Sequence, residues 1–409
     1  MKKIYTVLAA LGVTASMAAQ QLPNAGFEGE WTDCVPWTSN GNTKTKGVTP
    51  SPWTISNVIG ISGTGATQVG FQVEGCESAN AVQLKNTANQ YMPSQIVPGY
   101  ITLGTPWSTS VMGKQNDGGV FGGIEFTYRP DALSFDSKRT GVENAKSSVV
   151  AYSWKGTYTQ KSVPANIVIL GNPKSVDMID RDRNILGKET VKGGEVSHSD
   201  DAKLIAYIDQ YVYETAADED DNDEWETFEV EFMYESDENP EKINVILSPG
   251  EYFNSTVTND LTLTIDNVKL VYYSRLSGIK FKGVDIEGFD SEYFDYELDE
   301  IMPTDEKDIE VATMGNSGVA KAEVALDPQK NVATITVSND HGTDADNLAK
   351  HVYTVKFLPA GSSIADTAAD AANNVRYYNL QGNIVDADAL VSGQTYIKVA
   401  NGVATKIIK

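Results

Sequence analysis

Phe228-Glu229-Val230-Glu231-Phe232 decides the fold class, because apolar and acidic residues alternate strictly along it. Successive side chains of a β-strand point to opposite faces of the sheet, with a period of two residues. One face of this segment therefore belongs in a core and the other in solvent. The pattern predicts a half-buried β-strand.

Similar segments recur along the chain between clusters of Gly, Pro, Asn and Asp. The other segments rich in β-branched and aromatic residues are 68–73, 120–128, 148–154, 166–170, 242–247 and 261–273. Convincing amphipathic helices do not occur between them. The sequence therefore predicts an all-β protein built as a sandwich.

The charge of the chain narrows the classes of partner. Its 409 residues carry a formal net charge of -24. Nucleic-acid affinity comes largely from Lys and Arg that neutralise phosphates, so a nucleic-acid partner is excluded, and anionic lipid surfaces are disfavoured for the same reason. A neutral glycan fits this charge well.

The first 18 residues have the pattern of a signal peptide. Lys2-Lys3 precede a short apolar run from Ile4 to Val13, and Ser16-Met17-Ala18 gives the small-x-small cleavage pattern. The apolar run is too short to span a membrane, and no later segment is long enough. We expect an exported protein without a transmembrane segment.

The distribution of tryptophan and of linker residues predicts the domain organisation. All six tryptophans precede residue 226. We expect a large domain over 19–275 and a second sandwich over 276–360. Residues 361–374 are rich in Ala, Asp, Ser and Thr and read as a linker, followed by a short β tail over 375–409.

The two cysteines, Cys34 and Cys76, both lie in the exported part of the chain. An even number of cysteines in an oxidising compartment favours a disulfide, which would stabilise the fold by roughly 3–4 kcal/mol. The alternative is two independent buried thiols.

Trp37, Trp53 and Trp107 follow Pro in loops rich in Ser, Thr and Asn. Sugars stack their C–H faces on exposed aromatic rings, and loops on a rigid scaffold often carry binding residues. These three residues are therefore candidate glycan contacts, although tryptophan is also commonly buried. Trp31 and Trp154 are expected in the core.

Arg129 and a stretch of mixed charge are two further polar features of the first domain. Arg129 ends an apolar strand and could offer a bidentate fork to a sugar acid, or to a structural carboxylate, which is the favoured role. The mixed-charge stretch from Asp177 to Arg183 is expected to form a solvated surface.

Several short motifs in a fixed order make the first domain resemble the carbohydrate-metabolism domain of Bacteroidetes surface proteins. The motifs are Asn24-Ala25-Gly26-Phe27-Glu28 with Trp31, Pro98-Gly99, Leu103-Gly104, Gly122-Gly123-Ile124, Arg129-Pro130, Asn239-Pro240, Ile246-Leu247-Ser248 and Ile265-Asp266-Asn267-Val268. The resemblance implies a jelly-roll, galactose-binding-like sandwich with a carbohydrate role.

The same resemblance implies a structural Ca²⁺ ion where the two ends of the domain meet. Asn24, Glu28 and Asp266 would supply oxygen ligands, and two carboxylates sharing a site repel each other unless a cation or a proton lies between them. The alternative is that Glu28 caps a turn and Asp266 accepts hydrogen bonds from backbone amides, without a metal.

Two further resemblances concern the rest of the chain. Gly288-Phe289, Tyr296, Leu298 and Tyr353-Thr354-Val355-Lys356-Phe357 are similar to cadherin-like or Ig-like sandwiches of the same bacteria. Tyr378-Asn379-Leu380-Gln381-Gly382, Gly393, Tyr396-Ile397 and Lys406-Ile407-Ile408-Lys409 resemble the C-terminal sorting tail of the type IX (Por) secretion system. This tail implies contact with outer-membrane export machinery and a location at or beyond the cell surface.

The favoured function is a non-catalytic glycan-binding protein of the cell surface. A glycoside hydrolase or lyase is one alternative, but the sequence singles out no pair of carboxyl groups at the spacing that glycoside hydrolysis requires. A structural or adhesive protein that contacts another protein is the second alternative.

Overall fold

The computed structural model confirms the all-β prediction, with 53% of residues in strands and 3% in helices. The structure describes the following residues: 20–34, 37–39, 42–44, 47–57, 67–89, 92–111, 114–141, 145–161, 167–169, 177–188, 196–213, 224–254, 256–341, 350–359, 375–380, 382–400 and 403–409. The expected signal peptide (1–18) and linker (361–374) lie outside these ranges.

The first compact unit is a sandwich of two antiparallel sheets. The larger sheet has the order β22-β20-β15-β23-β10-β5, and β13 also pairs with β23. Its strands are β5 (Thr54–Ile55), β10 (Ile101–Thr102), β13 (Ile124–Glu125), β15 (Ser147–Lys155), β20 (Lys203–Val212), β22 (Met233–Tyr234) and β23 (Lys242–Ser248).

The smaller sheet has the order β21-β14-β24-β7-β6. Its strands are β6 (Gly70–Val73), β7 (Ala81–Lys85), β14 (Ala132–Thr140), β21 (Glu226–Glu231) and β24 (Thr262–Val271). From β7 onward the chain crosses repeatedly between the two sheets, and its last strand, β24, lies between β14 and β7. Such crossing is the connectivity of a jelly-roll sandwich.

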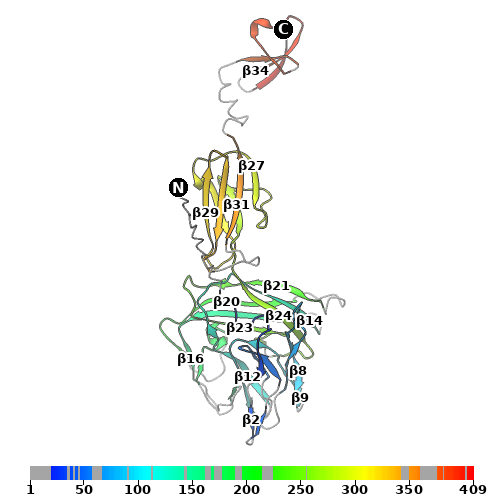
Figure 1. Cartoon of the computed structure of the whole chain (residues 1–409), viewed down its shortest axis with the longest axis vertical. Helices are drawn as coiled ribbons and strands as arrows, with labels where there is room; N and C mark the ends of the chain where they lie inside the picture. Colours follow the sequence, from blue (N-terminus) through cyan, green and yellow to red (C-terminus); the bar gives the residue numbers. More distant parts are fainter. Residues whose placement is uncertain are drawn as a thin grey trace, which may run out of the picture. The chain divides into compact units, whose positions relative to one another are not determined.

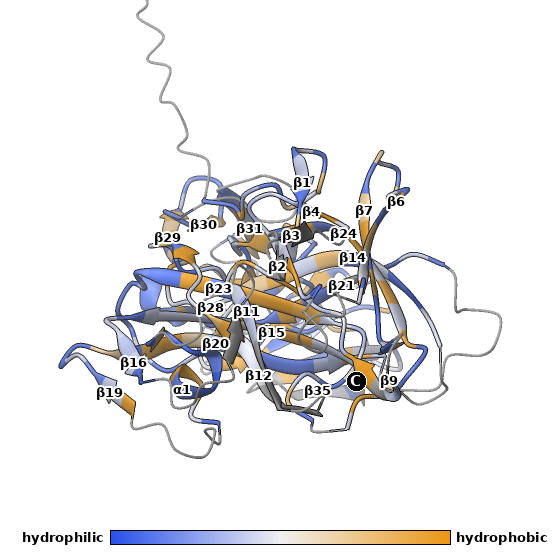
Figure 2. Cartoon of the chain, turned by 90° about the horizontal axis from the view of Figure 1, so that it is seen from below, coloured by the Kyte–Doolittle hydropathy of each residue, from blue (hydrophilic) through white to orange (hydrophobic). Residues whose placement is uncertain are grey.

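One apolar core fills the space between the two sheets. Phe27, Phe135, Ile208, Val245 and Ile265 are among its fully buried members. Each such side chain contributes roughly 1.5–3 kcal/mol through removal of its apolar surface from water. Figure 2 shows hydrophobic residues along β23.

Both faces of β15 are buried. Val149 and Ala151 belong to the core between the sheets, whereas Val150, Tyr152 and Trp154 belong to a second apolar cluster on the opposite face. This second cluster also contains Val120 and Ile185, so it packs against a layer outside the larger sheet. That layer, the outer layer, consists of α1 (Asp182–Ile185), β11 (Thr105–Val111), β12 (Lys114–Phe121), β16 (Tyr158–Gln160), β17 (Ile167–Ile169), β18 (Met178–Ile179) and β19 (Val196–His198).

Three two-stranded pairings complete the first unit. They are β1 (Trp31–Asp33) with β4 (Val48–Pro50), β2 (Trp37–Ser39) with β3 (Asn42–Lys44), and β8 (Thr87–Asn89) with β9 (Met92–Val97). Figure 1 shows the pairs β2–β3, β8–β9 and β11–β12 extending toward the same end of the sandwich.

The second unit contains a smaller sandwich with its own core. One sheet has the order β26-β25-β28 and the other β27-β31-β30-β29, in which β27 runs parallel to β31. Buried and less buried residues alternate cleanly along β30 and β31, as a half-buried strand requires. Its elements are β25 (Leu276–Phe281), β26 (Val284–Asp285), β27 (Asp295–Ile301), η1 (Glu306–Asp308), β28 (Ile309–Thr313), β29 (Lys321–Asp327), β30 (Val332–Ser338) and β31 (Lys350–Leu358).

The C-terminal residues form a separate four-stranded sheet with the order β33-β32-β34-β35. Tyr396 is its buried hydrophobic residue, whereas Leu380, Ile384 and Ile397 are exposed. The elements are β32 (Arg376–Tyr378), β33 (Ile384–Val385), η3 (Ala387–Ala389), β34 (Thr395–Ala400) and β35 (Val403–Ile408).

The compact units do not follow the sequence boundaries simply. The first unit ends its main stretch at Ser274, beside the expected boundary at 275, but it also includes Met314–Lys321 and Asn339–Ala349. The sequence predicts that both segments belong to the second sandwich, over 276–360. Their membership of the first unit depends on contacts between residues far apart in the chain.

Candidate functional site

Asp266 and Glu28 both hold the segment between β6 and β7. The Asp266 carboxylate accepts hydrogen bonds from the backbone N–H of Cys76, at 2.8 Å, and from the hydroxyl of Ser78. Glu28 accepts a bond from the backbone N–H of Asn80 at 2.7 Å and a second from its side-chain amide. The two carboxylates therefore bind neighbouring positions of one segment.

The contacts of these groups favour the interpretation without a metal. The other oxygen of Asp266 accepts the backbone N–H of Asn267 at 2.7 Å. Asn24 accepts the N–H of Gly29 and donates to the carbonyl of Ser51. Hydrogen-bond donors thus face the proposed calcium ligands, and within the described residues no three His, Cys, Asp or Glu side chains are grouped to hold a metal ion. Calcium at this position stays a prediction.

The expected Cys34–Cys76 disulfide is not formed, and both thiols are free. Cys34 is buried, and its sulfur accepts a hydrogen bond from Asn57 at 2.9 Å. Burial raises the pKa of the Cys34 thiol, which keeps the thiol protonated and unreactive. The structure therefore corresponds to the alternative of two independent thiols, although Cys76 is only half-buried.

Trp53 is buried, which contradicts its interpretation as an exposed platform for a sugar. Its side chain is 1% exposed, and its indole N–H donates to the carbonyl of Pro23 at 2.8 Å. The ring packs edge-on against Phe27, with centroids 5.8 Å apart. Trp53 stabilises the entry of the N-terminal segment into the core.

Trp107 is likewise buried, at 1% exposure, so it offers no ring face to a glycan. The guanidinium of Arg181 lies over its ring, 4.7 Å from the centroid. The backbone of Trp37 lies in β2, paired with Lys44 of β3, but its side chain lies outside the description. Trp154 is fully buried, as expected, and Trp31 packs against the core while half-buried.

Arg129 is a structural residue, and the fork expected for a sugar acid is already occupied. Its guanidinium donates to the backbone carbonyls of Ser317, Ser236 and Glu238. It also lies over the ring of Tyr234, 4.3 Å from the centroid, and it is 5% exposed. Three carbonyls, rather than the expected carboxylate, fix this side chain.

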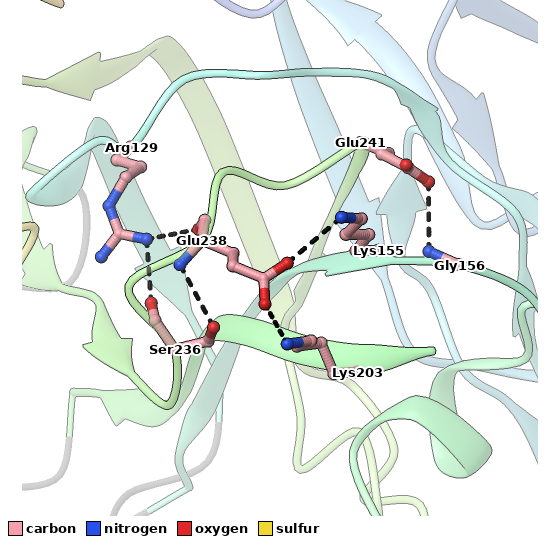
Figure 3. Close-up of polar contacts among 7 residues, drawn as sticks. All are labelled: Arg129, Lys155, Gly156, Lys203, Ser236, Glu238 and Glu241. Carbon is pink, nitrogen blue, oxygen red and sulfur yellow. Dashed lines mark hydrogen bonds and ion pairs between the residues drawn. The ribbon is translucent and has the colours of Figure 1, made fainter. Parts of the chain in front are cut away.

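The turn between β22 and β23, whose Ser236 and Glu238 carbonyls accept Arg129, is also held by other side chains (Figure 3). The Glu238 carboxylate forms ion pairs with Lys155, at 3.1 Å, and with Lys203. The Glu241 carboxylate accepts a hydrogen bond from the backbone N–H of Gly156. Both lysines and Glu238 are partly exposed, so these ion pairs contribute little to stability. The buried Arg129 is the main anchor of the turn.

The stretch from Asp177 to Arg183 was expected to be solvated, but its central residues are buried. Asp180, Arg181 and Asp182 are each at most 1% exposed. Asp180 pairs with Lys242 at 2.6 Å, and Asp182 accepts the hydroxyl of Tyr252 at 2.8 Å. Burial raises the pKa of the Asp182 carboxyl, with Arg181 and the hydrogen bonds opposing that rise.

This buried polar cluster exists because the outer layer covers the larger sheet. Tyr152 and Trp154 alternate with core-facing residues on β15, and large aromatic side chains on the second face of a strand indicate a covered face. That alternation is the feature of the sequence that could have predicted the outer layer. The charged residues themselves could not, because their composition is that of a surface loop.

No family model matches the chain, and a comparison with curated proteins found no match. Among the described residues, no helix has the length and apolar character needed to cross a membrane.

Proposed function

We propose that the chain is an exported, non-catalytic glycan-binding protein of the cell surface. The observation that carries this proposal is the composition of the three hairpins at one end of the jelly-roll sandwich (Figure 1). Lys44, Lys114 and Asp117 are the only charged residues in the six strands β2, β3, β8, β9, β11 and β12, in a chain that is 22% charged.

A set of strands poor in charge and rich in Thr, Ser, Asn and Gln suits a neutral polyhydroxylated ligand. Its hydroxyl and amide groups both donate and accept hydrogen bonds, as sugar hydroxyls do. Trp37 on β2 is the aromatic residue that we assign to stacking, now that Trp53 and Trp107 belong to the interior. Binding residues also concentrate on loops that a rigid scaffold positions.

Two observations support a non-catalytic role. Glu28 and Asp266, the carboxylates singled out from the sequence, are committed to hydrogen bonds that hold the chain. The buried Asp182 is bonded to Tyr252 and to the backbone N–H of Arg183. Carboxyl groups engaged in this way are not free to act as the acid and the base that flank a glycosidic bond.

A glycan array with the full-length chain tests the proposal, followed by titration calorimetry on any neutral glycan that binds. We expect Trp37→Ala to weaken binding at least tenfold while the melting temperature stays unchanged. Trp225→Ala is the control, because Trp225 is a partly exposed tryptophan that precedes β21 of the smaller sheet. Failure of the wild-type chain to bind any glycan would overturn the proposal.

Export and surface location belong to the same proposal. The Lys2-Lys3 signal peptide supports passage across the inner membrane. The C-terminal sheet supports recognition by export machinery, because Leu380, Ile384, Val391 and Ile397 expose apolar side chains that a protein partner could cover. A chain lacking residues 375–409 should then accumulate inside the cell envelope, as fractionation would show.

A further inference from the structure

The outer layer concentrates buried polar atoms that lack hydrogen-bond partners. Among the described residues, four such atoms lie in this layer or against it: Trp107 Nε1, Trp154 Nε1, Arg183 Nε and Asn184 Oδ1. Native proteins satisfy the great majority of buried polar groups, with ordered water where protein atoms do not reach. We therefore expect these atoms to have partners that the protein itself does not supply.

Two of the polar groups in this layer meet beside Gly119. A Cβ atom placed on Gly119 would lie 3.2 Å from Trp107 Nε1 and 3.0 and 3.1 Å from the two carboxylate oxygens of Asp182. The indole donor and the carboxylate thus lie around the same point, next to a residue that has no side chain. Both side chains are almost completely buried, at 1% and 0% exposure.

The hydrogen-bonding capacity of the two groups is complementary. The indole N–H of Trp107 is a donor only. The Asp182 carboxylate accepts the N–H of Arg183 at 2.7 Å through Oδ1 and the hydroxyl of Tyr252 at 2.8 Å through Oδ2. A carboxylate has about four acceptor positions, so Asp182 retains capacity for one more donor.

We propose that one buried water molecule bridges Trp107 Nε1 and the Asp182 carboxylate beside Gly119. This water accepts the indole N–H and donates one of its own hydrogens to the carboxylate. It satisfies the unpartnered indole and adds a third donor to a charge that is completely removed from solvent. Because Trp107 belongs to β11 and Asp182 to α1, the water also links two elements of the outer layer.

The bridge gives Gly119 a specific role. A Cβ atom at this position would lie within 3.2 Å of the carboxylate and the indole and would leave too little room for a water beside them. Tyr100, whose hydroxyl donates to the carbonyl of Gly119 at 3.2 Å, holds this backbone in place. The inference is independent of the proposed glycan function.

The test uses the full-length protein labelled with ¹⁵N-tryptophan, in which water-selective nuclear Overhauser and rotating-frame experiments detect long-lived water next to each indole. We expect a dipolar cross-peak between water and Hε1 of Trp107, assigned by its disappearance in Trp107→Phe. Trp53 is the matched control, because it is equally buried but donates to the Pro23 carbonyl, so its Hε1 should show no such peak.

Two further results decide the proposal. In Gly119→Ala the cross-peak of Trp107 should disappear, because the methyl group displaces the water. A crystal structure of the wild-type chain should show a water oxygen within about 3.2 Å of both Trp107 Nε1 and an Asp182 oxygen. Absence of the cross-peak, or a direct bond from Trp107 Nε1 to Asp182 with no water between them, would overturn the proposal.

Discussion

His341 is the residue through which pH acts on the first unit near neutrality. Its Nδ1 accepts the backbone N–H of Arg129 at 3.2 Å, and its ring packs against Tyr128. Burial is the main cause that lowers the pKa of His341 below 6.5, and Arg129 and Lys321 add to this, whereas Asp340 opposes it. The folded state therefore favours the neutral imidazole, which keeps its lone pair for the Arg129 amide.

The stability that His341 contributes is complete above its unfolded pKa and is lost as the pH falls through the lower folded pKa. We expect the melting temperature of the wild-type chain to fall about 1 °C or more further than that of His341→Asn between pH 7.5 and pH 5. His198→Asn is the control, because His198 is exposed. Equal pH dependence of all three proteins would contradict this prediction.

Single residues were the hardest level to predict from the sequence. Trp53 and Trp107 stand in polar, Pro-containing loops and look like surface residues, yet both are interior. Asp180, Arg181 and Asp182 look equally solvated and are buried. Burial depends on whether another part of the chain covers a residue, and local composition carries little information about that cover.

At the scale of elements, two carboxylates fix the segment between β6 and β7 by accepting hydrogen bonds from its backbone. Asp266 binds the N–H of Cys76, and Glu28 binds the N–H of Asn80. We expect these donors to offset the negative charges without a cation. We expect EDTA to leave the melting temperature of the first unit unchanged, within about 1 °C.

Thermal unfolding with EDTA, and after addition of excess Ca²⁺, measures this directly. Asp266→Ala provides the comparison, because loss of its three hydrogen bonds should lower stability by about 2–3 kcal/mol. A decrease of several degrees with EDTA that Ca²⁺ reverses would instead establish the calcium ion that the sequence resemblance implies.

Strands were predictable because their periodicity is local. The alternation in Phe228 to Phe232 marks β21 and the residue beyond it, and the expected strands 242–247 and 261–273 coincide closely with β23 and β24. The outer layer was not predictable, because its short strands pair with partners far along the chain. Only the aromatic residues on the second face of β15 pointed to it.

At the scale of the whole molecule, the first unit depends on residues that follow it in the sequence. The backbone N–H of Ser317 donates to Asp131 at 3.0 Å, and its carbonyl accepts Arg129 at 2.9 Å. A chain that ends at Ser274 lacks both partners and leaves a buried carboxylate and a buried guanidinium underbonded. Each such loss costs about 1–3 kcal/mol.

We therefore expect the truncated chain to melt roughly 5–10 °C below the first unit of the full chain. Tryptophan fluorescence reports this unit alone, since all six tryptophans precede residue 226. Arg129→Met separates the contact between Arg129 and Ser317 from other effects of truncation. The substitution should lower the melting temperature of the truncated chain less than that of the full chain. An identical cost in both would show that Ser317 does not stabilise Arg129.

Because the first unit consists of three separate stretches of sequence, its parts are synthesised at different times. Ribosomes deliver the chain from the N-terminus, and N-terminal domains generally fold first as they emerge. Here the last stretch of the first unit, Asn339–Ala349, is synthesised only after most of the second sandwich. The nascent first unit therefore emerges before the partner of Arg129 and Asp131 exists, and these two contacts form only after Ser317 has been synthesised.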